Sequence, residues 1–318
     1  MRKWITFLMT FLVGSASYVN ATMGDVNVFA GYRHDSIEHK DHVPSHDPVF
    51  KQSTKFKDID IFQIGVNVRS TIGCNFYARA EATWGWVLDG EVKRKASYEN
   101  HFSNYSYGSG SYEPGTGFNT LDELEFRNAI DDKYVYDVNV AIGYPFYFCD
   151  CSAIVAPVIG YSVNSQNLST YDNDFILGSD YCGHYLTAGS NCCKHTFMHR
   201  WYGPFVGVDF NYRPYHDCWN LYAAVEYHWG RCKVKTSDFS DNGRFSNHAD
   251  MDGWVVDLGA DYQMSECWTV GLYLKFTEFC ASKHHKSWDS EYSESGPRGK
   301  RHTDWNSYAV NLEFGRAF

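Results

Sequence analysis

Cysteine side chains carry the most distinctive chemistry of this 318-residue sequence, which contains ten of them. The pair Cys149-x-Cys151 lies in "YFCDCSAIV", between two runs rich in β-branched and aromatic residues. This spacing does not match the usual ligand spacings of zinc sites. Thiols form disulfides in exported proteins and stay reduced in the cytosol. The role of these cysteines therefore depends on the compartment that the chain occupies.

The N-terminus has the three regions of a secretory signal peptide. Two basic residues precede an apolar run, Trp4–Val13, and a small-residue segment, Gly14–Ala21. The apolar run is too short for a membrane-anchoring helix, which needs about 20 residues. We expect cleavage after Ala21, with Ala16 as the alternative. The expected division is a signal peptide over residues 1–21 and a single domain over residues 22–318.

The composition is unusual for a soluble secreted protein. Aromatic residues make up 18% of the chain, charged residues make up 21%, and the net charge is −10. A negative net charge disfavours nucleic-acid binding, so we expect no nucleic-acid partner. The mean hydropathy is −0.44, and after the N-terminus no apolar run is long enough for a spanning helix.

Period-2 alternation of apolar and polar residues is the main structural signal, and it predicts β-strands. In "DIDIFQIGVNVRS", for example, Phe62, Ile64 and Val66 alternate with Gln63 and Asn67. About ten such segments predict an all-β chain, and by residue number they are 25–33, 58–70, 75–88, 134–144, 153–164, 202–212, 220–230, 254–262, 268–276 and 307–318.

The lengths of the connections separate a soluble sandwich from a membrane barrel. Long connections are expected at 34–57, 89–133, 165–199, 232–251 and 281–304, and short ones at 71–75, 149–152, 213–219 and 264–267. Strict alternation of long and short links is typical of outer-membrane barrels, with short periplasmic turns and long extracellular loops. We expect an antiparallel up-and-down barrel of about ten strands, or twelve if residues 90–130 contain another hairpin.

In such a barrel the polar face of each strand lines the interior. The expected pore-lining residues are Arg69, Arg79, Glu81, Asp137, Asp209, Glu226, His228, Asp257, Asp261, Lys275 and Glu313. A barrel of about eight strands is filled by side chains, whereas 16–18 strands leave a channel. Ten strands therefore favour a narrow or occluded interior that is filled by ion pairs. Because acidic residues outnumber basic ones among these positions, any pore should have a weak preference for cations.

Barrel topology also divides the cysteines between two ends. Each short turn contains at least one, and the turn set is Cys74, Cys149, Cys151, Cys218 and Cys267. The others are expected in or beside the outer loops, and they are Cys182, Cys192, Cys193, Cys232 and Cys280. Five on each side cannot all pair within one barrel, and disulfide geometry limits the Cα separation to about 7 Å. The open alternatives are internal pairs with some idle thiols, or disulfides to other molecules.

The alternating strands, the cysteine-containing turns and the C-terminal "NLEFGRAF" resemble Gram-negative outer-membrane barrels, in particular the cysteine-rich Protochlamydia-type porin family. The resemblance implies a porin-like channel for ions or small solutes in the outer membrane, with disulfides to other cysteine-rich envelope proteins. It also implies that the terminal Phe318 is read by the barrel-assembly machinery. A non-conducting structural or adhesive barrel is the alternative.

The two segments 138–165 and 204–230 also resemble hairpins of the omptin proteases. The corresponding rim of this sequence has His248-x-Asp250 instead of the D-x-H of that family, and its acidic pair, Asp172-x-Asp174, lies in another loop. We therefore expect no enzymatic activity.

Histidines are expected in the outer loops, as solvated side chains. They are His34, His39, His42 and His46 in the first loop and His284 and His285 in the last. The pairs Cys182-x-His184 and Cys193-x-His195 lack a usual ligand spacing, so we expect no metal site and no cofactor.

Overall fold

The structure is a computed structural model of the whole chain, and it describes twelve segments. These are residues 21–43, 49–72, 75–99, 122–131, 134–149, 152–171, 175–176, 194–214, 218–238, 244–265, 267–284 and 300–317. None of them forms a helix that is long and apolar enough to cross a membrane. Several predictions lie outside the described residues: the signal peptide over residues 1–20, and Cys74, Cys151, Cys182, Cys192, Cys193, Asp172, Asp174, His46, His285 and Phe318.

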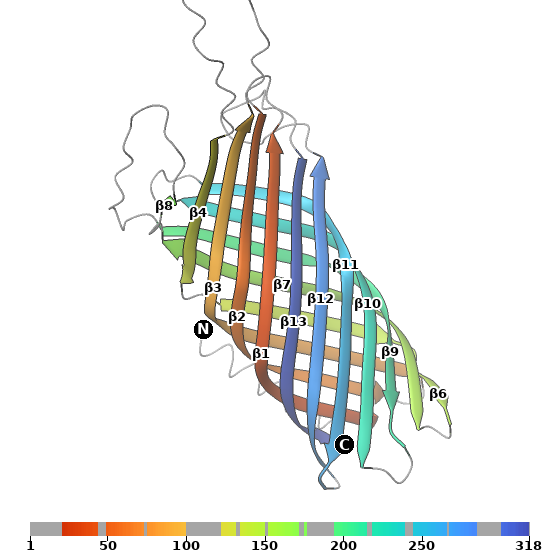
Figure 1. Cartoon of the computed structure of the whole chain (residues 1–318). Helices are drawn as coiled ribbons and strands as arrows, with labels where there is room; N and C mark the ends of the chain where they lie inside the picture. The colour runs from red at the N-terminus through yellow and green to blue at the C-terminus, as the bar shows by residue number, and fades with distance from the viewer. Residues whose placement is uncertain are drawn as a thin grey trace, which may run out of the picture.

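Long antiparallel strands make up the described chain (Figure 1). Their bounds are β1 Ala21–Val43, β2 Val49–Ile72, β3 Phe76–Glu99, β4 Asp122–Asp131, β5 Tyr134–Gly143, β6 Phe146–Phe148, β7 Ala153–Tyr171, β8 Phe175–Ile176, β9 Lys194–Tyr212, β10 Trp219–Asp238, β11 Arg244–Gln263, β12 Trp268–His284 and β13 Lys300–Ala317.

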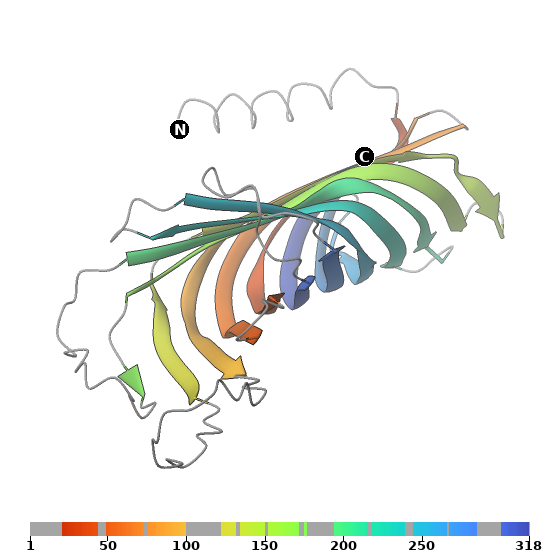
Figure 2. The ribbon, with the colours of Figure 1, turned by 90° about the horizontal axis from the view of Figure 1, so that it is seen from above.

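The sheet closes on itself with ten strand positions, because β2 pairs with both β1 and β3. Strands β4, β5 and β6 share one position: β4 and β5 pair with successive parts of β3, and β5 and β6 pair with successive parts of β7. The two-residue β8 pairs only with the loop end of β4. Figure 2 shows the two sides of the barrel facing each other. Within the described chain the ten-strand prediction is confirmed, and β3 and β4 extend one hairpin instead of adding a position.

The short connections are confirmed, whereas the predicted bounds of the long ones are wrong. Short turns join β2 to β3, β6 to β7, β9 to β10 and β11 to β12, and the described termini lie at this end (Figure 1). Much of each predicted long loop belongs to a strand, so that β1 reaches Val43 and β10 reaches Asp238. The 20 residues of β10 extend about 66 Å, whereas about 9–11 residues cross a bilayer. The strands therefore continue well beyond the membrane.

The outer surface carries an apolar band between two belts of exposed aromatic side chains, as expected for a membrane barrel. Near the short turns the belt includes Phe76, Phe148, Trp219, Tyr262 and Trp268. Toward the long loops the second belt includes Tyr32, Trp84, Trp229, Trp254, Phe276 and Tyr308. Exposed aliphatic residues such as Val140, Val208 and Leu272 lie between them. This band locates the lipid, and its short-turn end is the periplasmic end.

On the extracellular side of the loop-side belt, apolar side chains line the interior of the barrel instead of polar ones. We call this cluster the upper core; its aromatic centre is Trp201, Phe279 and Trp305, which are fully buried. The Phe279 and Trp305 ring centroids lie 5.3 Å apart, and those of Trp201 and Trp305 lie 5.8 Å apart. Burying each such side chain contributes roughly 1.5–3 kcal/mol. The extracellular half therefore has an apolar, packed interior, like the core of a soluble β-barrel.

Candidate functional site

All eleven predicted interior positions face the inside of the barrel, where they are buried or half-buried. They occupy the membrane-embedded half, below the upper core. Alternation along each strand places them there: Arg79 and Glu81 on β3 both point inward, and so do Glu226 and His228 on β10. Whether they line a conducting pore stays a prediction.

Arg79 is the centre of this polar network. Its Nε lies 3.1 Å from Oδ2 of Asp209, and its Nη1 donates a 3.0 Å hydrogen bond to the hydroxyl of Tyr222. Its Nη2 donates to Oε1 of Glu226. Asp257 is a more distant partner, with 3.8 Å between Nη1 and Oδ2. One guanidinium thus joins β3 to three strands on the other side of the barrel.

Glu226 connects Arg79 to a histidine. Its Oε2 lies 2.6 Å from Nε2 of His228 and accepts a 3.3 Å hydrogen bond from Nδ2 of Asn139. The other ring nitrogen of His228, Nδ1, lies 3.0 Å from the Ser162 hydroxyl. Both nitrogens therefore have partners, and the imidazole is held as a structural group.

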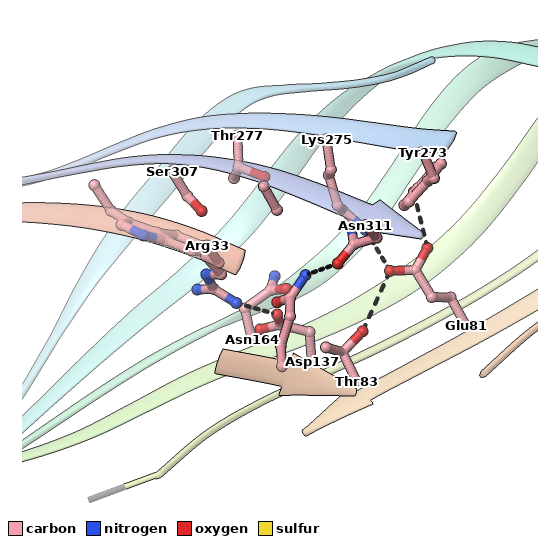
Figure 3. Close-up of a pocket in the computed structure, with 13 residues that line it drawn as sticks. Arg33, Glu81, Thr83, Asp137, Asn164, Tyr273, Lys275, Thr277, Ser307 and Asn311 are labelled. Carbon is pink, nitrogen blue, oxygen red and sulfur yellow. Dashed lines mark hydrogen bonds and ion pairs between the residues drawn. The ribbon is translucent and has the colours of Figure 1, made fainter. Parts of the chain in front are cut away.

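A second set of contacts lies beside a small cavity, drawn in Figure 3. Glu81 accepts a 2.8 Å hydrogen bond from Nζ of Lys275 and a 3.2 Å bond from the hydroxyl of Tyr273. Arg33 binds both oxygens of Asp35, at 2.6 and 2.7 Å, and Oδ2 of Asp137 at 2.5 Å. The Arg33 guanidinium also lies 5.3 Å from the Trp305 ring centroid. Arg33 therefore marks the boundary between the polar network and the upper core.

The periplasmic end of the interior is polar as well. The Arg69 guanidinium lies 3.6 Å from the ring centroid of Tyr222 and 3.8 Å from Oδ2 of Asp25. Nearby, Glu313 accepts a 2.7 Å hydrogen bond from Nδ2 of Asn67, and Asp261 accepts a 3.3 Å bond from Nδ2 of Asn220.

Little space remains between these side chains. Two cavities among the described interior residues have volumes of about 20 and 10 Å³, and about 10–15 Å³ holds one water molecule. The larger is lined by Arg33, Glu81, Asp137 and Lys275, among others. In the described residues, ion pairs fill much of the lower interior and the upper core lies above them.

Sequence reasoning missed several inward residues. Arg33 and Asp35 continue the alternation of Phe29 on β1, although the predicted strand ends at Arg33. Tyr222 and Tyr273 also face inward, although aromatic side chains are typical of the lipid-facing belts. Their hydroxyl groups were the available signal, since a buried hydroxyl needs a hydrogen-bond partner.

Five cysteines lie among the described residues, and none of these five forms a disulfide. Cys149 and Cys218 are exposed in short turns, and Cys267 is half-buried in another. Cys232 lies within β10 and not beside a loop; its side chain is 1% exposed in the upper core, which removes it as a cross-linking candidate. Cys280 also lies within a strand, β12, and it faces outward.

The histidines predicted in loops lie on strands where the chain is described. His34, His39 and His42 belong to β1, and His284 ends β12. Nδ1 of His34 lies 2.8 Å from Oδ1 of Asp60, and its ring stacks on Tyr308. Nδ1 of His39 lies 2.7 Å from the Thr303 hydroxyl. The strands extend beyond the membrane, so these residues lie on a folded wall and not in a loop.

Of the residues compared with the omptin catalytic pairs, His248 and Asp250 lie in the part of the chain that the structure describes. His248 and Asp250 are exposed and lie on the outer face of β11, which directs them away from the interior.

Among the solved structures that resemble this chain, one supports the barrel architecture. The outer membrane protease OmpT from Escherichia coli is similar in structure, with a TM-score of 0.60 and 12% sequence identity over 92% of this chain and 97% of that chain. The translocator domain of the autotransporter NalP from Neisseria meningitidis gives a TM-score of 0.35 at 11% identity, covering 97% of this chain and 95% of that one. OprG from Pseudomonas aeruginosa gives 0.31 at 10% identity, covering 93% and 96%. No curated protein matches the sequence.

At 12% identity the likeness to OmpT shows the shared fold alone. The family model described as Protochlamydia outer membrane protein matches residues 27–318, nearly the whole described barrel. Together with the lipid-facing band and the short turns, this match places the chain in the outer membrane. The chain belongs to the Protochlamydia outer membrane protein family.

Proposed function

We propose that the protein is a closed structural barrel of the outer membrane, linked by its periplasmic turn cysteines to other envelope proteins. The observation that carries the proposal is that three thiols, those of Cys149, Cys218 and Cys267, lie unpaired at the short-turn end. A barrel interior filled by side chains supports a structural role over free diffusion of solutes.

The geometry of the turns supports disulfides between molecules. Neighbouring turns are in contact, since the amide of Arg213 donates to the carbonyl of Ser152 at 2.7 Å and that of Gln263 donates to the carbonyl of Cys218 at 2.6 Å. Even so, the described thiols do not pair. Cys149 has a φ of 52°, a left-handed conformation in which glycine would be less strained. The turn thus presents a thiol to the periplasm at a position that disfavours a side chain.

The test is a non-reducing gel of outer membranes prepared with an alkylating agent. We expect high-mass species that collapse on reduction. Replacing all five turn cysteines, Cys74, Cys149, Cys151, Cys218 and Cys267, with Ser should decrease these species at least tenfold without loss of the folded barrel. The matched control is Cys280→Ser, which removes a thiol from the other end and should leave the ladder intact. A persistent ladder in the turn variant, or disulfides joining turn cysteines of one chain, would overturn the proposal.

A second candidate function is the passage of ions or small solutes, favoured by the polar network in the membrane-embedded half. Among its eleven predicted positions seven are carboxylates and three are Lys or Arg. Fixed negative charge attracts cations. Because the upper core closes the interior, conduction requires this core to open.

Planar bilayer recordings test this second role. We expect small, intermittent, weakly cation-preferring currents, and a weaker preference after Asp209→Asn with Asp257→Asn. Replacing both Phe279 and Trp305 with Ala removes the aromatic centre of the upper core and should increase the conductance, whereas the outward Phe276→Ala should not. Anion selectivity, or silence even in the opened variant, would contradict a channel.

Proteolysis is not part of the proposal. The sequence lacks the D-x-H order, and the outward His248 and Asp250 do not converge on an interior groove. Incubation of the folded barrel with unstructured peptides should give no cleavage above the boiled control.

A further inference from the structure

One cluster of metal-ligating side chains lies on the outer wall of the barrel, apart from the interior and from the turns. Cys280 comes from β12, and His302 and Asp304 come from β13. His302 and Asp304 are two residues apart and so point to the same face. Cys280 is the direct cross-strand partner of Asp304. Strand pairing therefore brings three different ligand types to one place.

The cluster lies on the extracellular side of the loop-side aromatic belt. Along β12 the belt residue Phe276 is followed on the same face by Glu278 and then by Cys280. Along β13 the belt residue Tyr308 is separated from Asp304 by Asn306 on the same face. Both strands are therefore polar at this height, and the site is open to the extracellular medium.

Distances within the cluster suit a single small ion. The thiol sulfur of Cys280 lies 3.8 Å from Nε2 and 3.9 Å from Nδ1 of His302. Nε2 of His302 lies 2.9 Å from Oδ1 of Asp304. Ligand atoms bonded to one tetrahedral zinc at about 2.0–2.3 Å are about 3.3–3.6 Å from each other. All three ligand atoms lie within 4.8 Å of one another, so small side-chain rotations complete the site.

The chemistry of the three donors selects the kind of ion. A thiolate, an imidazole and a carboxylate together are typical ligands of Zn²⁺, whereas Mg²⁺ and Ca²⁺ prefer oxygen alone. The acidic residues Asp252 and Glu278 act electrostatically on Cys280 as well. They add negative charge around a position where a dication would bind. With three protein ligands, one coordination position stays open for water.

We propose that Cys280, His302 and Asp304 form an extracellular zinc-binding site. Binding replaces the thiol proton of Cys280 by the Zn–S bond and releases this proton to solvent. No local sequence motif marks this site, because Cys280 and His302 are separated by a connection and meet only through the pairing of β12 and β13.

The experiment measures zinc-dependent protection of Cys280 in the full-length, detergent-folded protein kept reduced with a non-chelating phosphine. Alkylation of each cysteine is followed by peptide mass spectrometry, with Zn²⁺ or with Mg²⁺ as the control ion. We expect Zn²⁺ to slow alkylation of Cys280 at least tenfold and Mg²⁺ to have no effect. The exposed Cys218 should be alkylated equally fast under all conditions.

Variants distinguish a three-ligand zinc site from nonspecific binding of zinc to the thiol of Cys280. His302→Ala and Asp304→Asn should each decrease the protection of Cys280 at least fivefold. The matched control is His34→Ala, which removes another outward histidine paired with an aspartate, 2.8 Å from Asp60, and should change nothing. Co²⁺ should give a thiolate charge-transfer band that Cys280→Ser abolishes. Equal alkylation with and without Zn²⁺, or a disulfide at Cys280 in protein isolated from cells, would overturn the proposal.

Discussion

At the scale of single residues, the stability of the interior depends on Arg79 more than on any acid around it. Arg79→Ala leaves Asp209 and Glu226 buried without their cation, and breaking a buried ion pair in this way costs about 3–5 kcal/mol. We expect a decrease of this size in the free energy of unfolding, measured by urea titration in detergent. The exposed Arg231 on β10 is the control, since Arg231→Ala should change stability by less than about 0.5 kcal/mol. Equal effects of the two variants would contradict the role of Arg79.

Asp257 differs from Glu226 although both are fully buried. Among the described residues neither carboxylate oxygen of Asp257 has a hydrogen-bond partner. Its cations are Arg79, 3.8 Å away, and its cross-strand neighbour Lys275, which does not hydrogen-bond to it. Burying a charge without such partners is costly. We therefore expect Asp257→Asn to preserve or increase the free energy of unfolding, and Glu226→Gln to decrease it, in the same urea titration. A large loss in Asp257→Asn would show that water or an ion stabilises this carboxylate.

The interior residues could be predicted where an unbroken alternation crosses the membrane, as for Arg79, Glu81 and Glu226. Alternation could not show which of them meet, because Arg79 and Glu226 are 147 residues apart. For the same reason the sequence does not predict the cluster of Cys280, His302 and Asp304, because its geometry follows from the register of β12 and β13.

At the scale of the strands, apolar side chains change from the outer face to the inner face beyond the membrane. This change explains why the predicted strands end too early. On β12 the apolar side chains Leu272, Leu274 and Phe276 face lipid, and beyond them Phe279 and Ala281 face inward. The apolar residues thus change from even to odd positions without any break in the strand. A search for one continuous alternation stops at this change, and it therefore predicts loops where the strands continue.

A β-bulge in β2 is a second local feature that alternation alone did not reveal. The register of β2 shifts between Lys57 and Asp60, and Asp58 has a φ of 52°. As a result Phe56 and Ile59 both face inward. A bulge adds one residue to the strand, so that inward-facing residues on either side of it are three positions apart instead of two.

The bulge predicts a specific order of stability among variants of Asp58. Asp58→Val should decrease the free energy of unfolding by about 1–2 kcal/mol, because a β-branched residue is strained at positive φ. Asp58→Gly should preserve it or increase it slightly. Urea titration of the two variants beside Lys57→Val, at a neighbouring position of ordinary conformation, measures the difference. A Val variant as stable as the Gly variant would show that the bulge relaxes.

At the scale of the whole molecule, the closed ring of ten strand positions predicts slow, all-or-none unfolding in detergent. The purified protein should migrate faster on a gel when it is not heated, because the compact barrel persists in detergent until it is boiled. Arg79→Ala should lower the temperature at which the fast band disappears. A monodisperse protein that stays soluble without detergent would contradict the membrane assignment.

The upper core also has a calorimetric consequence. Lipid-facing side chains stay in detergent when the barrel unfolds, so they change the heat capacity little. Trp201, Phe279, Trp305 and their neighbours instead pass from a dry interior into water, and exposing apolar surface to water raises the heat capacity. A scan of this protein should therefore show a heat-capacity increment set mainly by its extracellular half. Because burial from water contributes less on cooling, that half should also be the part weakened by cold.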